Sequence, residues 1–433
     1  MRGTDLMTHS RVVLHPNPCR TVVRPFEPGF PEGFAGTGKS RLQLIAERIL
    51  SLDEPHLRAE LKRIVASFSG RQDDVERILL RRFDETIGEL GVDGNGLNRL
   101  RKLVIGGYFC EEYSFESAAL FNPSVVLHHD QSGVPQGSVR FVMSLRGIGE
   151  GHVSSVTFRT GIWTPGGDIQ IDDPHPAGIP PQIERKEGPE GYESVYLSCG
   201  GARDISETVL FPFTAAQRQG IEDLRLVSFQ EDDGRISHLG TYTAFSGSVA
   251  RSELLRVSED LHHFEMHPLR GSVAQSKGMA LFPRRIGGRY AALGRQDNEN
   301  VWFVTSDDLI TWDGGEKIIP PKYSWEFVQM GNCGSPIEID EGWLVLTHGV
   351  GSVRNYCIGA SLLDKDDPAR LIKRMELPLV HPSPKERDGY VPNVVYSCGG
   401  LVHDGMLLLP YGVADTFTTF ATVKVDDVLA AMV

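Results

Sequence analysis

The chain has 433 residues, of which 40% are hydrophobic and 23% charged, so it is long enough to bury a substantial core. Its net charge of -13 argues against nucleic acid or an anionic membrane surface as the main partner. The sequence also lacks a signal-peptide pattern and any run near the roughly 18 apolar residues of a membrane span.

Cysteine and histidine usage argues against a metal centre. The cysteines are too widely spaced for a metal site or a disulfide scaffold, and the histidines form no HExxH arrangement. We therefore expect a soluble, cytoplasmic protein with reduced thiols and no metal. The six cysteines are Cys19, Cys110, Cys199, Cys333, Cys357 and Cys398.

The first part of the chain is expected to be helical. From Lys39 to about Leu103, apolar residues recur at spacings of three and four, which predicts three or four packed helices. Residues 1–113 are therefore assigned to an N-terminal segment that is mostly helical from about residue 39. It would cap the rest of the protein or form a contact between subunits of a homo-oligomer.

Gly33 to Ser40 fits the phosphate-loop pattern GxxxxGKS, which in nucleotide-binding proteins follows a buried strand. Here the preceding residues, 24–31, contain three prolines and cannot form a central strand. We therefore interpret this motif as a glycine-rich lead into a helix.

Beyond about Ser114 the pattern changes to short β-branched and aromatic runs separated by turn residues. The runs recur as five copies, the later ones about 55 residues apart, within the range of β-propeller blades. Residues 114–433 are thus predicted to form an all-β, five-bladed β-propeller catalytic domain, with residues 164–212 as an inserted loop. The copies begin near Phe121, Glu222, Met279, Ser335 and Asn393.

Charged residues stand at the ends of several predicted strands. Glu222 and Asp223 open an apolar strand, and Asp415 ends another. The first residues of innermost propeller strands surround the central channel, so we expect these side chains to share one site. Acids beside bases in a pocket suit sugar cleavage, in which an acid protonates the leaving oxygen. The same set includes Asn122, Arg146, Lys277, Arg295, His348 and Asn393.

Six motifs in this order resemble glycoside hydrolase family 130, the mannoside phosphorylases and β-mannosidases with five-bladed propellers. The resemblance runs from about Phe121 to the C-terminus. Its motifs are Phe121-Asn122-Pro123, Glu222-Asp223-Leu224-Arg225, Ala280-Leu281-Phe282-Pro283 with Gly288-Arg289-Tyr290, Gly342 to Val350, Val391 to Val395, and Tyr411 to Thr416.

The resemblance implies a role for each candidate residue. Asp223 corresponds to the family's proton donor, which is thought to act through the 3-hydroxyl of the bound mannose. Phosphate would attack the anomeric carbon from the other face with inversion. Substrate-binding positions would be Asn122, Arg146, Glu222, Arg225 and Asp415, and phosphate-binding positions would be Lys277, Arg295 and His348.

Two positions depart from the family pattern. Leu224 replaces a proline, and a further lysine of the family phosphorylases has no counterpart in the region of Glu326. The preferred prediction is phosphorolysis of a β-mannoside to mannose 1-phosphate, with inorganic phosphate as co-substrate and no other cofactor. One alternative is an inverting β-mannosidase in which Glu326 or Glu338 activates water; another is a carbohydrate-binding propeller without catalysis. Linkage and acceptor sugar stay open.

Overall fold

The computed structural model describes residues 6–31, 38–68, 70–72, 74–188, 192–383 and 388–433. The chain forms two compact units. One comprises Met1–Pro18, Phe115–His175 and Pro181–Val433, and the other comprises Cys19–Ser114 and Pro176–Pro180.

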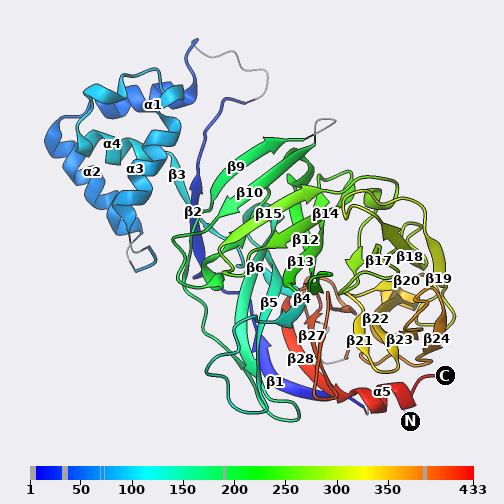
Figure 1. Ribbon diagram of the computed structural model, residues 1–433. Coiled ribbons are helices and arrows are strands. Elements are labelled where there is room, and N and C mark those ends of the chain that lie inside the picture. The colour runs from blue at the N-terminus through cyan, green and yellow to red at the C-terminus, as the bar shows by residue number, and fades with distance from the viewer. Residues whose placement is uncertain (1–5, 32–37, 69, 73, 189–191, 384–387) are drawn as a thin grey trace. The chain divides into compact units, whose positions relative to one another are not determined.

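The smaller unit is mostly helical (Figure 1). Side chains of Ser40, Asp53, Asp74 and Asn98 cap the α-helices described in this unit and satisfy backbone N–H groups that have no partner within a helix. Ser40 therefore lies where the predicted lead into a helix ends, while residues 33–37 of that motif lie outside the described residues. The helices are α1 (Arg41–Leu50), α2 (Glu54–Ser67), α3 (Val75–Thr86) and α4 (Arg99–Tyr108).

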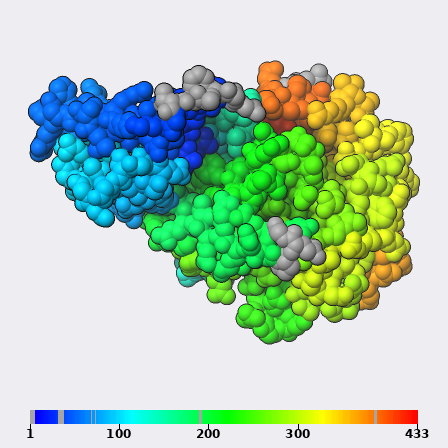
Figure 2. All heavy atoms as spheres, turned by 90° about the horizontal axis from the view of Figure 1, so that it is seen from above, coloured from blue at the N-terminus to red at the C-terminus, as the bar shows by residue number. Residues whose placement is uncertain are grey.

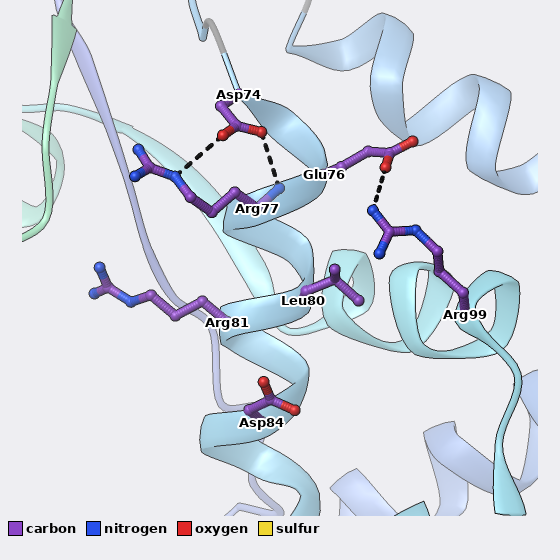
Figure 3. A pocket seen from close by; sticks show the side chains of 7 residues that line it. All are labelled: Asp74, Glu76, Arg77, Leu80, Arg81, Asp84 and Arg99. Carbon is purple, nitrogen blue, oxygen red and sulfur yellow. Dashed lines mark hydrogen bonds and ion pairs between the residues drawn. The ribbon is translucent and has the colours of Figure 1, made fainter. Parts of the chain in front are cut away.

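A three-stranded sheet completes this unit. β2 (Thr21–Pro25) pairs with β3 (Cys110–Ser114) antiparallel and with β8 (Ala177–Gly178) parallel. A surface pocket beside α3 is lined by charged residues, two pairs of which form ion pairs with each other, Arg77 with Asp74 and Arg99 with Glu76 (Figure 3). None of the predicted site residues lines this pocket.

The larger unit consists mainly of antiparallel sheets. An eleven-stranded sheet contains two of the predicted copies, joined by a single parallel register position between Gly220 and Ser154. Its strands are β4 (Ala119–Leu127), β5 (Val139–Ile148), β6 (Ser154–Trp163), β7 (Ile169–Ile171), β9 (Gln182–Glu187), β10 (Glu193–Ser198), β11 (Val209–Leu210), β12 (Gly220–Gln230), β13 (Ile236–Phe245), β14 (Ala250–Val257) and β15 (His263–Pro268).

Three further sheets follow along the chain. The first contains β16 (Ala280–Leu281), β17 (Tyr290–Gly294), β18 (Val301–Ser306) and β19 (Glu316–Ile319). The second contains β20 (Gln329–Asn332), β21 (Ile337–Ile339), β22 (Gly342–Val350), β23 (Tyr356–Leu363) and β24 (Leu371–Arg374). The last contains β25 (Val395–Tyr396), β26 (Leu401–His403), β27 (Met406–Val413), β28 (Phe417–Lys424) and β1 (Thr8–Leu14), and helix α5 (Val425–Ala430) follows β28.

The first strand of the chain lies beside the last one (Figure 1). β1 pairs antiparallel with β28, so that Thr8 lies opposite Thr422. The segment predicted as residues 1–113 is thus divided: its beginning belongs to the sheet unit, and Cys19–Ser114 belongs to the helical unit.

Residues 164–212, predicted as an inserted loop, contain strands of their own. β9 pairs with β10, and β10 pairs with β15, so this segment extends an existing sheet. Every residue of β9 is exposed, and green atoms of this stretch of the chain lie on the face shown in Figure 2. The sequence Gln182–Glu187 lacks the alternation of apolar and polar residues by which a strand is identified.

The prediction of a mostly β protein with N-terminal helices is confirmed. Apolar residues of neighbouring strands form the cores; one cluster joins residues of β22, β23, β27 and β28. Within the described ranges, no helix is long and apolar enough to cross a membrane.

Candidate active site

Two bulged strands bring Asn122 and Asp223 together. The pairing of β4 with β5 shifts between Phe121 and Ser124, and the pairing of β12 with β13 shifts between Glu222 and Arg225. Asn122 and Asp223 lie inside these irregularities with φ angles of 49° and 53°, in the left-handed region. Nδ2 of Asn122 donates a hydrogen bond to Oδ1 of Asp223 over 2.7 Å.

Arg146 connects the two acids at the start of β12. Its Nη2 donates to Glu222 at 2.6 Å, and its Nη1 lies 3.4 Å from Oδ1 of Asp223. Nε donates to Ser154, and the guanidinium lies 5.1 Å from the centre of the Phe121 ring. The side chain is thereby fixed from three directions, and it pairs with both acids.

Arg225 is buried behind Asp223 and was predicted to bind substrate. Its Nη1 donates to the backbone oxygen of Asp223, Nε to the backbone oxygen of Cys333 and Nη2 to the hydroxyl of Tyr396, at 2.8, 2.8 and 2.9 Å. Only 1% of its side chain is exposed. All three nitrogens are engaged by the protein, so Arg225 holds the backbone of Asp223 in place. Its contact with substrate stays a prediction.

The two aspartates of the site ionise very differently. Burial raises the pKa of Asp223, but Arg146, Arg225, the hydrogen bond from Asn122 and the charge of Lys277 outweigh it and lower the pKa to about 2. Burial raises the pKa of Asp415 to about 6, and the negative charges of Asp223 and Glu222 add to this effect against Arg146 and Arg354. Asp415 is therefore the carboxyl that takes up a proton near pH 6.

Arg295, Lys277 and His348 form the basic side of the site. Arg295 is 4% exposed; its Nε donates to the backbone oxygen of Lys277, and its Nη1 lies 3.1 Å from Nε2 of His348. Arginine can only donate, so Nε2 of His348 is the acceptor. Burial and the neighbouring charge of Arg295 hold the pKa of His348 well below its usual value.

The three residues expected to bind phosphate do not all supply positive charge. His348 is a neutral acceptor that orients Arg295, and the charge comes from Arg295 and Lys277. Lys277 is exposed, and its charge also acts on Asp223, which places the basic side next to the acid.

Glycine permits the close approach of Arg295 to the backbone. Gly278 has a φ of +89°, and a Cβ there would lie 2.3 Å from Nε of Arg295. A Cβ at Gly331 would lie 2.6 Å from the ring of His348. A side chain at either position would displace the basic groups.

Sequence reasoning did not identify Tyr396 or Arg354. The ring of Tyr396 meets the ring of His348 edge-on at 5.0 Å, and its hydroxyl accepts the hydrogen bond from Arg225. Arg354 influences the ionisation of Asp415. Tyr396 directly follows the motif Val391 to Val395, which could have identified it. Arg354 stands in a loop with no recognisable pattern.

The two glutamates proposed as bases for water are both engaged in ion pairs. Glu326 is 1% exposed, accepts from the backbone N–H groups of Lys322 and Tyr323, and pairs with Arg374 at 2.6 Å. Glu338 forms two 2.8 Å hydrogen bonds with Arg284. The hydrogen bonds with Arg284 lower the pKa of Glu338, which makes it a weaker base. The ion pairs give both glutamates a structural role.

Comparison with known proteins finds relatives that are mannoside phosphorylases. It is 33% identical over 230 residues to a 1,2-β-oligomannan phosphorylase of a Thermoanaerobacter species, covering 52% of this chain and 75% of that protein. It is 30% identical over 231 residues to a β-1,2-mannobiose phosphorylase of Listeria innocua, covering 51% and 62%.

Solved structures show the same fold. The structure of a β-1,2-mannobiose phosphorylase from Listeria innocua with β-1,2-mannobiose matches with a TM-score of 0.50 and 24% identity, over 74% of this chain and 92% of that chain. The family model described as β-1,4-mannooligosaccharide phosphorylase matches residues 203–433. Because this match spans more than half of the chain, the protein belongs to glycoside hydrolase family 130.

Proposed function

We propose that the protein cleaves β-mannosides by phosphorolysis, with inversion, and releases mannose 1-phosphate. The observation that carries this proposal is the juxtaposition of a buried acid, Asp223, with a cationic pair, Arg295 and Lys277. An attacking phosphate needs this positive charge, whereas water does not. The relatives named above are phosphorylases of mannose oligomers, which supports the same reaction class.

We further propose that residues 114–433 form a five-bladed β-propeller catalytic domain around this site. The repeated antiparallel sheets and the single register position that joins β6 to β12 support five separate blades. The fold shared with a family member agrees with this arrangement. On the basis of the sequence, we expect a cytoplasmic enzyme, and its helical unit is a candidate contact for homo-oligomers.

In the proposed mechanism, one phosphate oxygen forms a bond to the anomeric carbon as the glycosidic C–O bond breaks. The proton of Asp223 passes to the leaving oxygen, through the 3-hydroxyl of the mannose as the family resemblance implies. Asn122, Arg146, Glu222 and Asp415 are the proposed mannose-binding residues, and Arg295, Lys277 and His348 the proposed phosphate-binding residues.

The low pKa of Asp223 requires an explanation in this mechanism, because an acid must be protonated to donate. A bound phosphate adds negative charge beside Lys277 and Arg295, and this opposes the field that keeps Asp223 ionised. We propose that phosphate binding raises the pKa of Asp223 and so prepares the acid. The raised pKa of Asp415 makes it the alternative donor, and the two are distinguished by the variants below.

Hydrolysis is the less favoured alternative. An inverting hydrolase needs a second carboxylate, roughly 6.5–9.5 Å from the acid, to activate water. Both glutamates considered for this role are held by arginines. A carbohydrate-binding protein without catalysis has no need of a buried acid beside cations.

The proposal is tested by incubating β-1,2- and β-1,4-mannobiose with and without phosphate. We expect phosphate-dependent cleavage with mannose 1-phosphate as product, and its loss in Asp223→Asn. Asp307→Asn, at an exposed surface ion pair, is the matched control and should behave as the parent. Cleavage that ignores phosphate and yields only free mannose would contradict phosphorolysis, and binding without any cleavage would favour the non-catalytic alternative.

A further inference from the structure

An exposed tyrosine lies alongside the strand end that carries Asp415. The backbone N–H of Val391 donates to the oxygen of Ala414, and that of Tyr390 donates to the hydroxyl of Thr416 at 2.9 Å. These hydrogen bonds hold residues 390 and 391 against Ala414 and Thr416, the residues on either side of Asp415 in the chain. Tyr390 is nevertheless 68% exposed, although a large aromatic ring gains free energy from burial.

The ring of Tyr390 is supported from one side by His152. The two rings stack with centroids 5.8 Å apart and planes 27° from parallel. His152 lies in a short 3-10 turn, Glu150–His152, directly beyond the strand that carries Arg146, and has a left-handed φ of 57°. One ring face is therefore held in place while the tyrosine remains largely open to solvent.

A third loop adds a cation near the same aspartate. Val353 and Arg354, just after β22 and its His348, have φ angles of 55° and 53°. Two successive non-glycine residues in this region are uncommon. Arg354 is exposed, and its guanidinium lies 5.8 Å from the centre of the Tyr356 ring. The backbone N–H of Tyr356 donates to the oxygen of Asn393, so this loop lies against the segment that carries Tyr390. In agreement with this placement, the charge of Arg354 lowers the pKa of Asp415.

We propose that Tyr390, backed by His152, and Arg354 bind the sugar on the leaving-group side of the scissile bond. This inference rests on the function proposed above. Asp415 and its neighbours would hold the mannose whose glycosidic bond is broken. The sugar on the other side of that bond would then contact the residues beside Asp415 that face solvent. An exposed, pre-oriented aromatic ring offers a flat apolar surface to the C–H face of a neutral sugar, and a guanidinium donates to its hydroxyls.

The test compares binding of mannose and mannobiose by calorimetric titration, which needs no turnover. In Tyr390→Ala we expect mannobiose to bind about tenfold more weakly and mannose to bind as it does to the parent. Tyr390→Phe keeps the ring and should retain mannobiose affinity. Arg354→Ala should weaken mannobiose binding severalfold without changing mannose binding.

Tyr108→Ala, at a partly exposed tyrosine of α4, is the matched control and should leave both affinities unchanged. Thermal unfolding verifies that each variant is folded. Parent-like affinity of both Tyr390→Ala and Arg354→Ala for mannobiose, or an equal loss of both sugars, overturns the inference. A parent that binds neither sugar overturns the proposed function itself, and a parent that binds mannobiose but does not cleave it overturns only catalysis.

Discussion

The acidic and basic sides of the site differ in how their buried groups ionise. On the acidic side, Asp223 is surrounded by cations and stays ionised, while Asp415, with more negative neighbours, takes up a proton near pH 6. On the basic side, burial and the charge of Arg295 keep His348 neutral. Burial thus favours the neutral form of all three groups, and only at Asp223 do the neighbouring groups outweigh it.

The largest effect is expected when Asp223 is neutralised. Asp223→Asn removes the proposed donor while keeping the hydrogen-bonding shape, and we expect kcat to fall about 10²–10⁴-fold. Asp415→Asn should instead weaken substrate binding and leave a measurable kcat. Steady-state kinetics with mannobiose and phosphate distinguishes the two, and the opposite pattern would assign the proton to Asp415.

On the basic side, Arg295→Ala should raise the KM for phosphate roughly 10–100-fold, the worth of a hydrogen bond to a charged group. Arg295→Lys keeps the charge but loses the fork that reaches both Lys277 and His348, so an intermediate KM is expected. The KM for mannobiose should change little. An equal loss for both substrates would show that Arg295 supports the whole site rather than the anion.

The raised pKa of Asp415 predicts a specific dependence of stability on pH. The folded protein holds this proton up to about pH 6, whereas the unfolded chain releases it near pH 4, so this carboxyl lowers stability as the pH rises through that window. The effect is on the order of 3 kcal/mol. Urea unfolding at pH 4 and pH 7 should therefore show Asp415→Asn gaining stability relative to the parent at pH 7.

Gly278→Ala should give the smallest effect, a loss of about 1–3 kcal/mol of stability with weaker phosphate binding. The added Cβ would meet Arg295, whereas a Cβ at Gly405, which also has a positive φ, meets no atom within 4 Å. Gly405→Ala therefore isolates the backbone strain. If both variants lose the same stability and keep phosphate affinity, close approach at Gly278 has no functional role.

Much of the architecture was readable from local patterns. The apolar periodicity predicted the helices, and strand runs bounded by turn residues predicted the sheets, because both patterns reflect burial of one face. β9 was missed because all six of its residues are exposed, so its sequence has no alternation of apolar and polar residues. The pairing of β1 with β28 was missed because it depends on contacts between the two ends of the chain.

Local sequence patterns also indicated part of the candidate site. Charged residues that end apolar strands are unusual, so Asp223, Arg146 and Asp415 stood out. The bulges that turn Asn122 and Asp223 toward each other are backbone conformations. Asn and Asp adopt a left-handed φ more often than most other residues, but residue type alone does not indicate which of them do so. The neutrality of His348 and the ion pairs of Glu326 and Glu338 likewise depend on partners that are distant in the chain.

The pairing of β1 with β28 also has a consequence for synthesis. Thr8 emerges from the ribosome long before Thr422, its partner in the sheet. The first strand must therefore wait, unpaired, until nearly the whole chain has been translated. Completion of this sheet is a late, high-contact-order step, and during that delay an open strand edge is available to chaperones or to other nascent chains.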